Sequence, residues 1–163
     1  MILSKPTFTI RIAEAADVPG LACLFHQTVV THGPEHYTPE QTAAWARSAT
    51  ETEAFHRFIL DATTLVALDS EGIAGFGGLA EDGHITALYV RYDCLRQGVG
   101  SALMEEILKQ ARERHLLRLY AEASHFSLGL FQKFGFSHYA TEIVERRGVE
   151  FQRFLVERKL SGN

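Results

Sequence analysis

The sequence predicts an α/β fold with a single mixed, mostly antiparallel sheet flanked by helices on both faces. Short apolar runs separated by tight turns alternate with longer segments that carry an apolar stripe at helical spacing. The expected order is strand, helices, three-strand meander, helix, strand, helix and strand pair. This order fits neither a run of βαβ units nor an all-β barrel, so a mixed sheet is the expected architecture.

The first part of the chain should contain one strand and three helices. Residues 8–12 alternate apolar and polar side chains, which is typical of a strand. Asp17 is expected to cap the first helix, and residues 31–37 to form a loop after it. Thr38-Pro39-Glu40-Gln41 and Thr50-Glu51-Thr52-Glu53 match the capping box, so each should begin a further helix.

The middle of the chain predicts a meander followed by a long helix. The strands are expected at 63–68, 73–79 and 84–90, with glycine in both turns, where a positive φ is favourable. A helix is expected over 98–115. Its buried stripe consists of residues four apart: Val99, Leu103, Ile107 and Ala111.

The last part should hold a strand, a helix and a hairpin. We expect the strand at 117–122 and the helix at 124–134, where Gly135 ends it. The hairpin strands are expected at 136–145 and 150–158, on either side of Arg147-Gly148.

Length and composition favour one soluble domain over residues 1–163. The chain is 46% hydrophobic and 22% charged, with a net charge of -4, which argues against disorder. No apolar run reaches the ~20 residues of a membrane span, and the first seven residues lack a secretory signal, so we expect a cytoplasmic protein. Cys23 and Cys94 form no metal or redox motif. No basic cluster indicates nucleic-acid binding.

A glycine loop carries the clearest chemical signal. Leu95-Arg96-Gln97-Gly98-Val99-Gly100-Ser101 joins a strand end to a helix start, where converging backbone amides and the helix dipole suit a phosphate. Leu103 stands where a dinucleotide fingerprint needs glycine, and no Lys-Ser/Thr pair completes a nucleoside-triphosphate loop. The alternative is a glycine turn that merely starts a helix.

This loop, together with Ala87-Leu88-Tyr89-Val90 and Phe131-Gln132-Lys133-Phe134-Gly135-Phe136, resembles the core motifs of the GNAT superfamily of N-acetyltransferases. The element order is also that family's order, with strands four and five splayed. Tyr37-Thr38-Pro39-Glu40-Gln41 and Tyr120-Ala121-Glu122-Ala123-Ser124 resemble a bacterial subgroup called YafP-like. The resemblance implies an acetyl-coenzyme A-dependent N-acetyltransferase. No metal is expected, because His32 and His36 have no carboxylate partner at metal-binding spacing.

The resemblance also implies a set of residues for the donor. The loop would hold the pyrophosphate of acetyl-coenzyme A, and the strand end would pair with its pantetheine arm. The donor residues expected from this are Leu88, Tyr89, Val90, Leu95, Arg96, Gln97, Gly98, Val99, Gly100, Ser101, Ser124 and Phe131. Leu95 replaces the family's Arg or Gln, and Phe131 replaces a tyrosine that often serves as general acid. Ser124 could instead be the N-cap of its helix.

Acetyl transfer to an amine needs a base, because an alkylammonium with a pKa of ~10.4 is only about 0.04% neutral at pH 7. Two residues compete for this role. His84 has an imidazole suited to proton transfer at neutral pH, and the resemblance places Glu122 near the substrate amine. Either could instead be a solvated side chain. The Val90 amide is the expected donor to the oxyanion.

The acceptor is expected to be a small-molecule amine. Tyr37, His36 and Trp45 lie in the segment that the resemblance places over the acceptor, although Trp45 could be a core residue. Residues 1–90 hold 4 basic and 11 acidic side chains, against 12 and 9 in residues 91–163, which favours a cationic amine. A non-catalytic acyl-coenzyme A-binding module and a protein N-acetyltransferase are the alternatives. A monomer and a homodimer both stay open.

Overall fold

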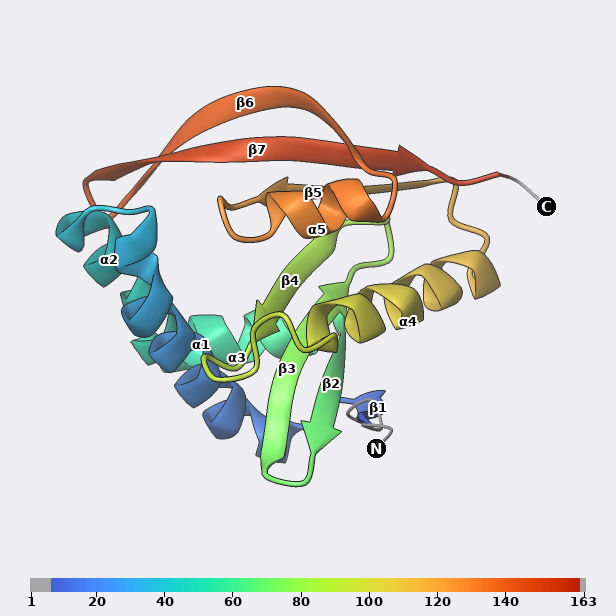
Figure 1. Ribbon diagram of the computed structural model, residues 1–163, viewed down its shortest axis with the longest axis horizontal. Helices are drawn as coiled ribbons and strands as arrows, with labels where there is room; N and C mark the ends of the chain where they lie inside the picture. The colour runs from blue at the N-terminus through green and yellow to red at the C-terminus, as the bar shows by residue number, and fades with distance from the viewer. Residues whose placement is uncertain (1–6, 162–163) are drawn as a thin grey trace, which may run out of the picture.

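A computed structural model describes residues 7–161, which confirm the mixed α/β fold and the predicted element order (Figure 1). The strands are β1 (Thr9–Ile12), β2 (Thr63–Asp69), β3 (Gly72–Leu79), β4 (Ile85–Val90), β5 (Arg118–Ala123), β6 (Ser137–Arg146) and β7 (Val149–Lys159). The helices are α1 (Val18–His32), α2 (Pro39–Ala46), α3 (Thr52–Leu60), α4 (Val99–Glu113) and α5 (Leu128–Lys133). Short 3-10 turns η1 (Ala15–Asp17), η2 (Gly33–Glu35) and η3 (Arg47–Thr50) join some of them.

Where one sheet was predicted, the structure has two sheets, each with antiparallel strands. One has the order β1-β2-β3-β4 and the other β5-β7-β6. A parallel bridge between His84 and Tyr120 joins them, and the Tyr120 amide donates to the Gly83 carbonyl over 3.1 Å. Gly83 is required at this point, because its φ is +96° and a Cβ there would lie 2.1 Å from the Arg118 carbonyl oxygen. Beyond the bridge β4 runs away from β5, as the predicted splay requires (Figure 1).

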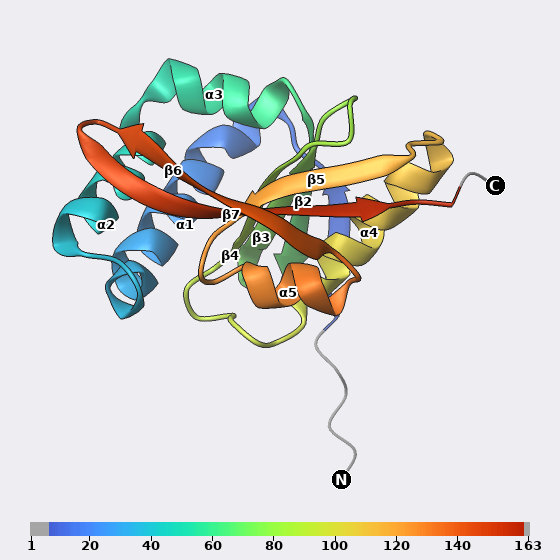
Figure 2. The same ribbon diagram turned by 90° about the horizontal axis from the view of Figure 1, so that it is seen from above.

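Helices cover both faces of the β1–β4 sheet (Figures 1 and 2). The stripe predicted for α4 is buried, and it packs against Leu65 and Ala67 of β2. Val66, which lies between these two residues on the strand, points to the other face and packs in the cluster formed by α1 and α3. Each fully buried aliphatic side chain contributes about 1.5–3 kcal/mol, so these two layers hold β4 in place.

The C-terminal hairpin arches over the end of the molecule that carries the splay (Figure 1). Its turn is the predicted Arg147-Gly148 pair, with φ of 53° and 77°. Two contacts tie it to the N-terminal helices. Gln41 donates to the Glu150 carbonyl over 2.8 Å, and Arg147 forms an ion pair with Glu51. The hairpin therefore covers the region between the two sheets and α2.

Predicted caps are confirmed at one helix and wrong at the others. Thr38 and Gln41 exchange both bonds of the capping box at α2. Thr50 instead donates to the Arg47 carbonyl within η3, and α3 begins at Thr52 without a side-chain cap. Asp17 occupies the predicted N-cap position of α1, but its side chain makes no capping bond, because its carboxylate bonds Arg11 and the Glu14 amide.

Some predicted boundaries also change. The expected loop at 31–37 begins with the last residues of α1 and continues as η2. The expected helix at 124–134 is shorter, since α5 begins at Leu128. Ser124 therefore caps a turn that precedes α5, where its hydroxyl accepts from the amides of Phe126 and Ser127. Residues 1–6, on which the absence of a signal segment was judged, lie outside the described range.

Within residues 7–161, no helix has both the length and the apolar character needed to cross a bilayer.

Candidate active site

Two cavities meet where β4 and β5 separate. The larger has a volume of about 490 Å³ and the smaller about 190 Å³. Both are lined by the residues at their junction: Trp45, Ile85, Thr86, Tyr89, Glu122 and Ser124. A molecule in the smaller cavity can therefore reach one in the larger at this point.

The smaller cavity follows β4, and its backbone groups are available there. The Arg91 amide donates to the Ala74 carbonyl over 2.8 Å, so Arg91 and Tyr89 direct their backbone groups toward β3. The alternate residues, Leu88 and Val90, direct theirs toward the opening. Thr28 of α1 donates to the Val90 carbonyl over 2.8 Å, which fixes this end of the strand.

The start of α4 has free amides and nearby positive charge. Gly98 has a φ of +91°, which glycine adopts without strain, and no side chain caps the helix. The first-turn amides and the helix dipole therefore suit an anion. Lys133 of α5 donates to the Ser101 hydroxyl over 3.1 Å, which adds a cation that the sequence analysis did not single out.

The other expected donor residues occupy different environments. Leu95 and Phe131 line the smaller cavity. Val99 is 1% exposed and packs in the core, so it can offer a ligand only its backbone. Gln97 donates to the Asp93 carbonyl, and Arg96 is exposed with a φ of 63°. Gly100 lies against α5, since a Cβ there would be 2.9 Å from the Leu130 side chain.

The two candidate bases form one hydrogen-bonded pair. Nε2 of His84 lies 2.7 Å from Oε2 of Glu122, and both side chains line the larger cavity. The His84 ring stacks on Tyr120 with centroids 4.8 Å apart. Asp82 accepts from the Tyr120 hydroxyl and from the His84 amide, so it fixes the Tyr120 ring and the His84 backbone.

The neighbouring groups set the protonation states of Glu122 and Tyr120. The His84 hydrogen bond lowers the pKa of Glu122, and Arg153, 3.9 Å from Oε1, lowers it further. The hydrogen bond to Asp82 raises the pKa of Tyr120 to about 12. Glu122 is therefore a carboxylate at neutral pH, and Tyr120 is a neutral phenol.

The larger cavity has aromatic walls. Its aromatic lining residues are Phe25, Tyr37, Trp45, Phe55, Phe58, Tyr89 and Phe151. The Trp45 indole donates to the Tyr89 hydroxyl over 3.2 Å, and the Tyr37 hydroxyl accepts from the His125 amide over 3.2 Å. Burial raises the pKa of Tyr89 to about 12, so this hydroxyl stays protonated. Of the three expected acceptor residues, His36 lies outside both linings, stacked on His125.

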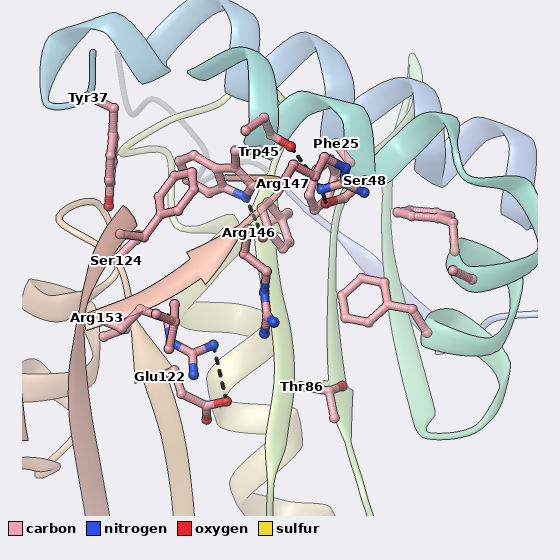
Figure 3. A pocket seen from close by; sticks show the side chains of 18 of the residues that line it. Phe25, Tyr37, Trp45, Ser48, Thr86, Glu122, Ser124, Arg146, Arg147 and Arg153 are labelled. Carbon is pink, nitrogen blue, oxygen red and sulfur yellow. Dashed lines mark hydrogen bonds and ion pairs between the residues drawn. The ribbon is translucent and has the colours of Figure 1, made fainter. Parts of the chain in front are cut away.

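Three arginines of the hairpin also line the larger cavity (Figure 3). Arg146, Arg147 and Arg153 come from residues 91–163 and Glu51 from residues 1–90, so both parts of the chain supply charge to this cavity. Strand alternation could have found Arg146, because it falls on the same face of β6 as Val144, which also lines the cavity.

Cys94 and His32 have structural environments. Cys94 is buried and accepts from Arg91 over 3.0 Å, and burial raises the pKa of its thiol. His32 bonds Glu35 and the Tyr92 carbonyl. Across residues 7–161, no three histidine, cysteine or acidic side chains gather in a group able to hold a metal ion.

Comparison with known proteins identifies relatives with the same fold. A family model described as an acetyltransferase (GNAT) domain matches residues 34–157. The uncharacterized N-acetyltransferase YafP of Escherichia coli (strain K12) is 28% identical over 150 residues, which are 92% of this chain and 95% of that protein.

Solved structures agree with this. A GCN5-related N-acetyltransferase from Rhodopseudomonas palustris has a TM-score of 0.90 and 27% identity, covering 98% of this chain and 99% of that one. PaiA N-acetyltransferase from Thermoplasma acidophilum, solved with coenzyme A, shares the fold with a TM-score of 0.77 and 20% identity, covering 94% and 99%. With a family model matched over most of its length, the chain belongs to the GNAT family of acetyltransferases.

Proposed function

We propose that the protein transfers acetyl from acetyl-coenzyme A to the amine of a small molecule, within one domain spanning residues 1–163. The observation that carries this is the junction of the two cavities, where the smaller cavity along β4 opens beside His84 and Glu122. The family relationship supports the donor and the reaction type. A cytoplasmic location is proposed with it, since acetyl-coenzyme A is available there.

The donor would lie along β4. Its phosphates would meet the first-turn amides of α4 and the ammonium of Lys133. Its pantetheine arm would occupy the smaller cavity and pair with the outward backbone groups of Leu88 and Val90. The Val90 amide would then stabilise the oxygen of the thioester as it becomes negative.

The acceptor would lie in the larger cavity with its nitrogen near His84. With Nε2–H donated to Glu122, Nδ1 of His84 is left to accept the proton that the ammonium must lose. The Glu122 carboxylate holds the ring in this tautomer and stabilises the imidazolium that forms. Because its pKa is lowered, Glu122 is better suited to this role than to removing the proton directly.

The transfer step needs no general acid. The amine nitrogen forms a bond to the thioester carbon, and the bond from that carbon to sulfur then breaks. A thiol with a pKa near 8.5 leaves readily as thiolate and takes a proton from solvent. Phe131, which has no proton to give, therefore does not prevent catalysis.

The test combines donor binding with a reaction screen. Isothermal titration should give saturable binding of acetyl-coenzyme A below millimolar concentration. Thiol release should then be measured with amines, amino acids, aminoglycosides and polyamines, and with peptides as a separate arm. Release with a small amine supports the proposal. Binding with no release from any acceptor would point to a non-catalytic binding module, and release with peptides alone to a protein acetyltransferase.

A further inference from the structure

We propose that Arg146 binds an anionic group of the acceptor, so that the substrate is a small amine that also carries a carboxylate. This inference rests on the proposed acetyl transfer. It assigns to the larger cavity two ends with different chemistry, an amine end at His84 and an anion end at the hairpin.

Among the described residues that line the larger cavity, Arg146 is the charged one for which no partner is found. It ends β6, and its side chain extends from the hairpin into the cavity (Figure 3). Within residues 7–161, its guanidinium makes no hydrogen bond or ion pair with the protein. A cation that lines a cavity and is neutralised by nothing around it favours a ligand of opposite charge.

The other charged groups of the lining neutralise one another or nearby residues. Arg147 is held by Glu51 and by the Ala44 carbonyl, so it ties the hairpin to the helices. Arg153 pairs with Glu142 of the neighbouring strand and lies 3.9 Å from Glu122. Glu122 in turn accepts from His84.

The chemistry of arginine selects the anionic group. A guanidinium presents a planar fork of N–H donors that matches both oxygens of a carboxylate. An amine without such a group would leave the charge of Arg146 without a partner in the bound complex.

The walls indicate the body of the molecule between these ends. They are aromatic, from Phe55 and Phe58 on one side to Phe151 on the hairpin. A volume of about 490 Å³ admits an amino acid with a large apolar side chain. An aromatic amino acid therefore combines the amine, the carboxylate and the apolar surface that the cavity calls for.

The experiment uses pairs of amines that differ by one carboxylate. Phenylalanine would be compared with 2-phenylethylamine, and tryptophan with tryptamine, by thiol release with saturating acetyl-coenzyme A. We expect kcat/KM of the wild-type protein to favour the carboxylated member by about tenfold or more. Arg146→Gln should remove this preference and Arg146→Lys should keep part of it. Arg112→Gln, at an exposed position on α4, is the matched control and should retain it.

A binding measurement separates the anion site from catalysis. Isothermal titration with 3-phenylpropanoate, which has the carboxylate and no amine, should show about tenfold weaker binding to Arg146→Gln than to wild type or Arg112→Gln. Binding that depends on Arg146, without thiol release from any amine, would keep the anion site and reject the proposed function. Equal rates for both members of each pair, or a preference that survives in Arg146→Gln, would overturn the inference and leave acetyl transfer standing.

Discussion

Nε2 of His84 lies 2.7 Å from Oε2 of Glu122, although the two residues are 38 positions apart, with His84 directly before β4 and Glu122 in β5. The bridge between His84 and Tyr120 sets this geometry, because Glu122 follows Tyr120 by two residues and shares its face of β5. The two candidate bases are thereby placed where the two sheets begin to separate.

The shared hydrogen bond predicts that His84 and Glu122 act as one unit. His84→Ala and Glu122→Gln should each lower kcat by about 100-fold or more, which is typical of the loss of a general base. The double variant should lose little beyond either single one, because the second change removes a partner that no longer functions. Thiol-release kinetics measure this.

The dissociation constant of acetyl-coenzyme A is the control for these variants and should stay near the wild-type value. A double variant whose loss equals the product of the two single losses would mean that the residues act independently. Wild-type rates in both single variants would reject both as catalytic residues.

Lys133 is predicted to contribute to donor binding through its charge. Lys133→Gln should raise the dissociation constant of coenzyme A about three- to tenfold at low ionic strength, and added salt should shrink this difference because it screens exposed charges. Lys109→Gln, at an exposed position further along α4, is the matched control. Equal effects of the two substitutions in isothermal titration would contradict a local contact with the phosphates.

Thr28 is predicted to be a positioning residue for Val90. Thr28→Val keeps the shape and removes the hydroxyl that donates to the Val90 carbonyl, so the strand end should be held less firmly. We expect kcat to fall about tenfold while donor affinity changes little, since small displacements near reacting atoms are costly. Thr28→Ser should restore the rate. Equal loss in both variants would argue against the hydroxyl.

The Arg11–Asp17 pair predicts a change of stability with pH. The Arg11 hydrogen bond lowers the pKa of Asp17 to about 2, from 3.8 for the free side chain. Its stabilisation is therefore complete above pH 3.8 and is lost as the pH falls toward 2. Asp17→Asn should cost about 1 kcal/mol of unfolding free energy at pH 7, because Arg11 is partly exposed.

Urea unfolding at several pH values measures this difference. The difference in unfolding free energy between wild type and Asp17→Asn should stay constant from about pH 5 to about pH 7. It should narrow below pH ~4. A gap that persists unchanged at pH ~2 would mean that the carboxylate charge does not stabilise the fold.

Local patterns in the sequence were sufficient for the order of elements. Alternation and turn glycines located the strands, and apolar spacing located α4, because these features depend on neighbours along the chain. The second capping box did not form, because the Thr50 hydroxyl donates to the Arg47 carbonyl within η3. The motif does not reveal this turn.

The assembly of the site depended on contacts between distant segments. Sequence reasoning found His84 and Glu122 separately, but their pairing follows from a single bridge between the two sheets. The charge of residues 1–90 suggested a cationic acceptor, whereas the hairpin brings Arg146 and two further arginines into the cavity. A sum of charges along the chain does not include that placement.

The two cavities are lined in part by different segments of the chain. The β6–β7 hairpin lines the larger cavity, whereas Leu95 and α5 line the smaller one. Substitutions in the hairpin can therefore change which amine is chosen without disturbing the common donor.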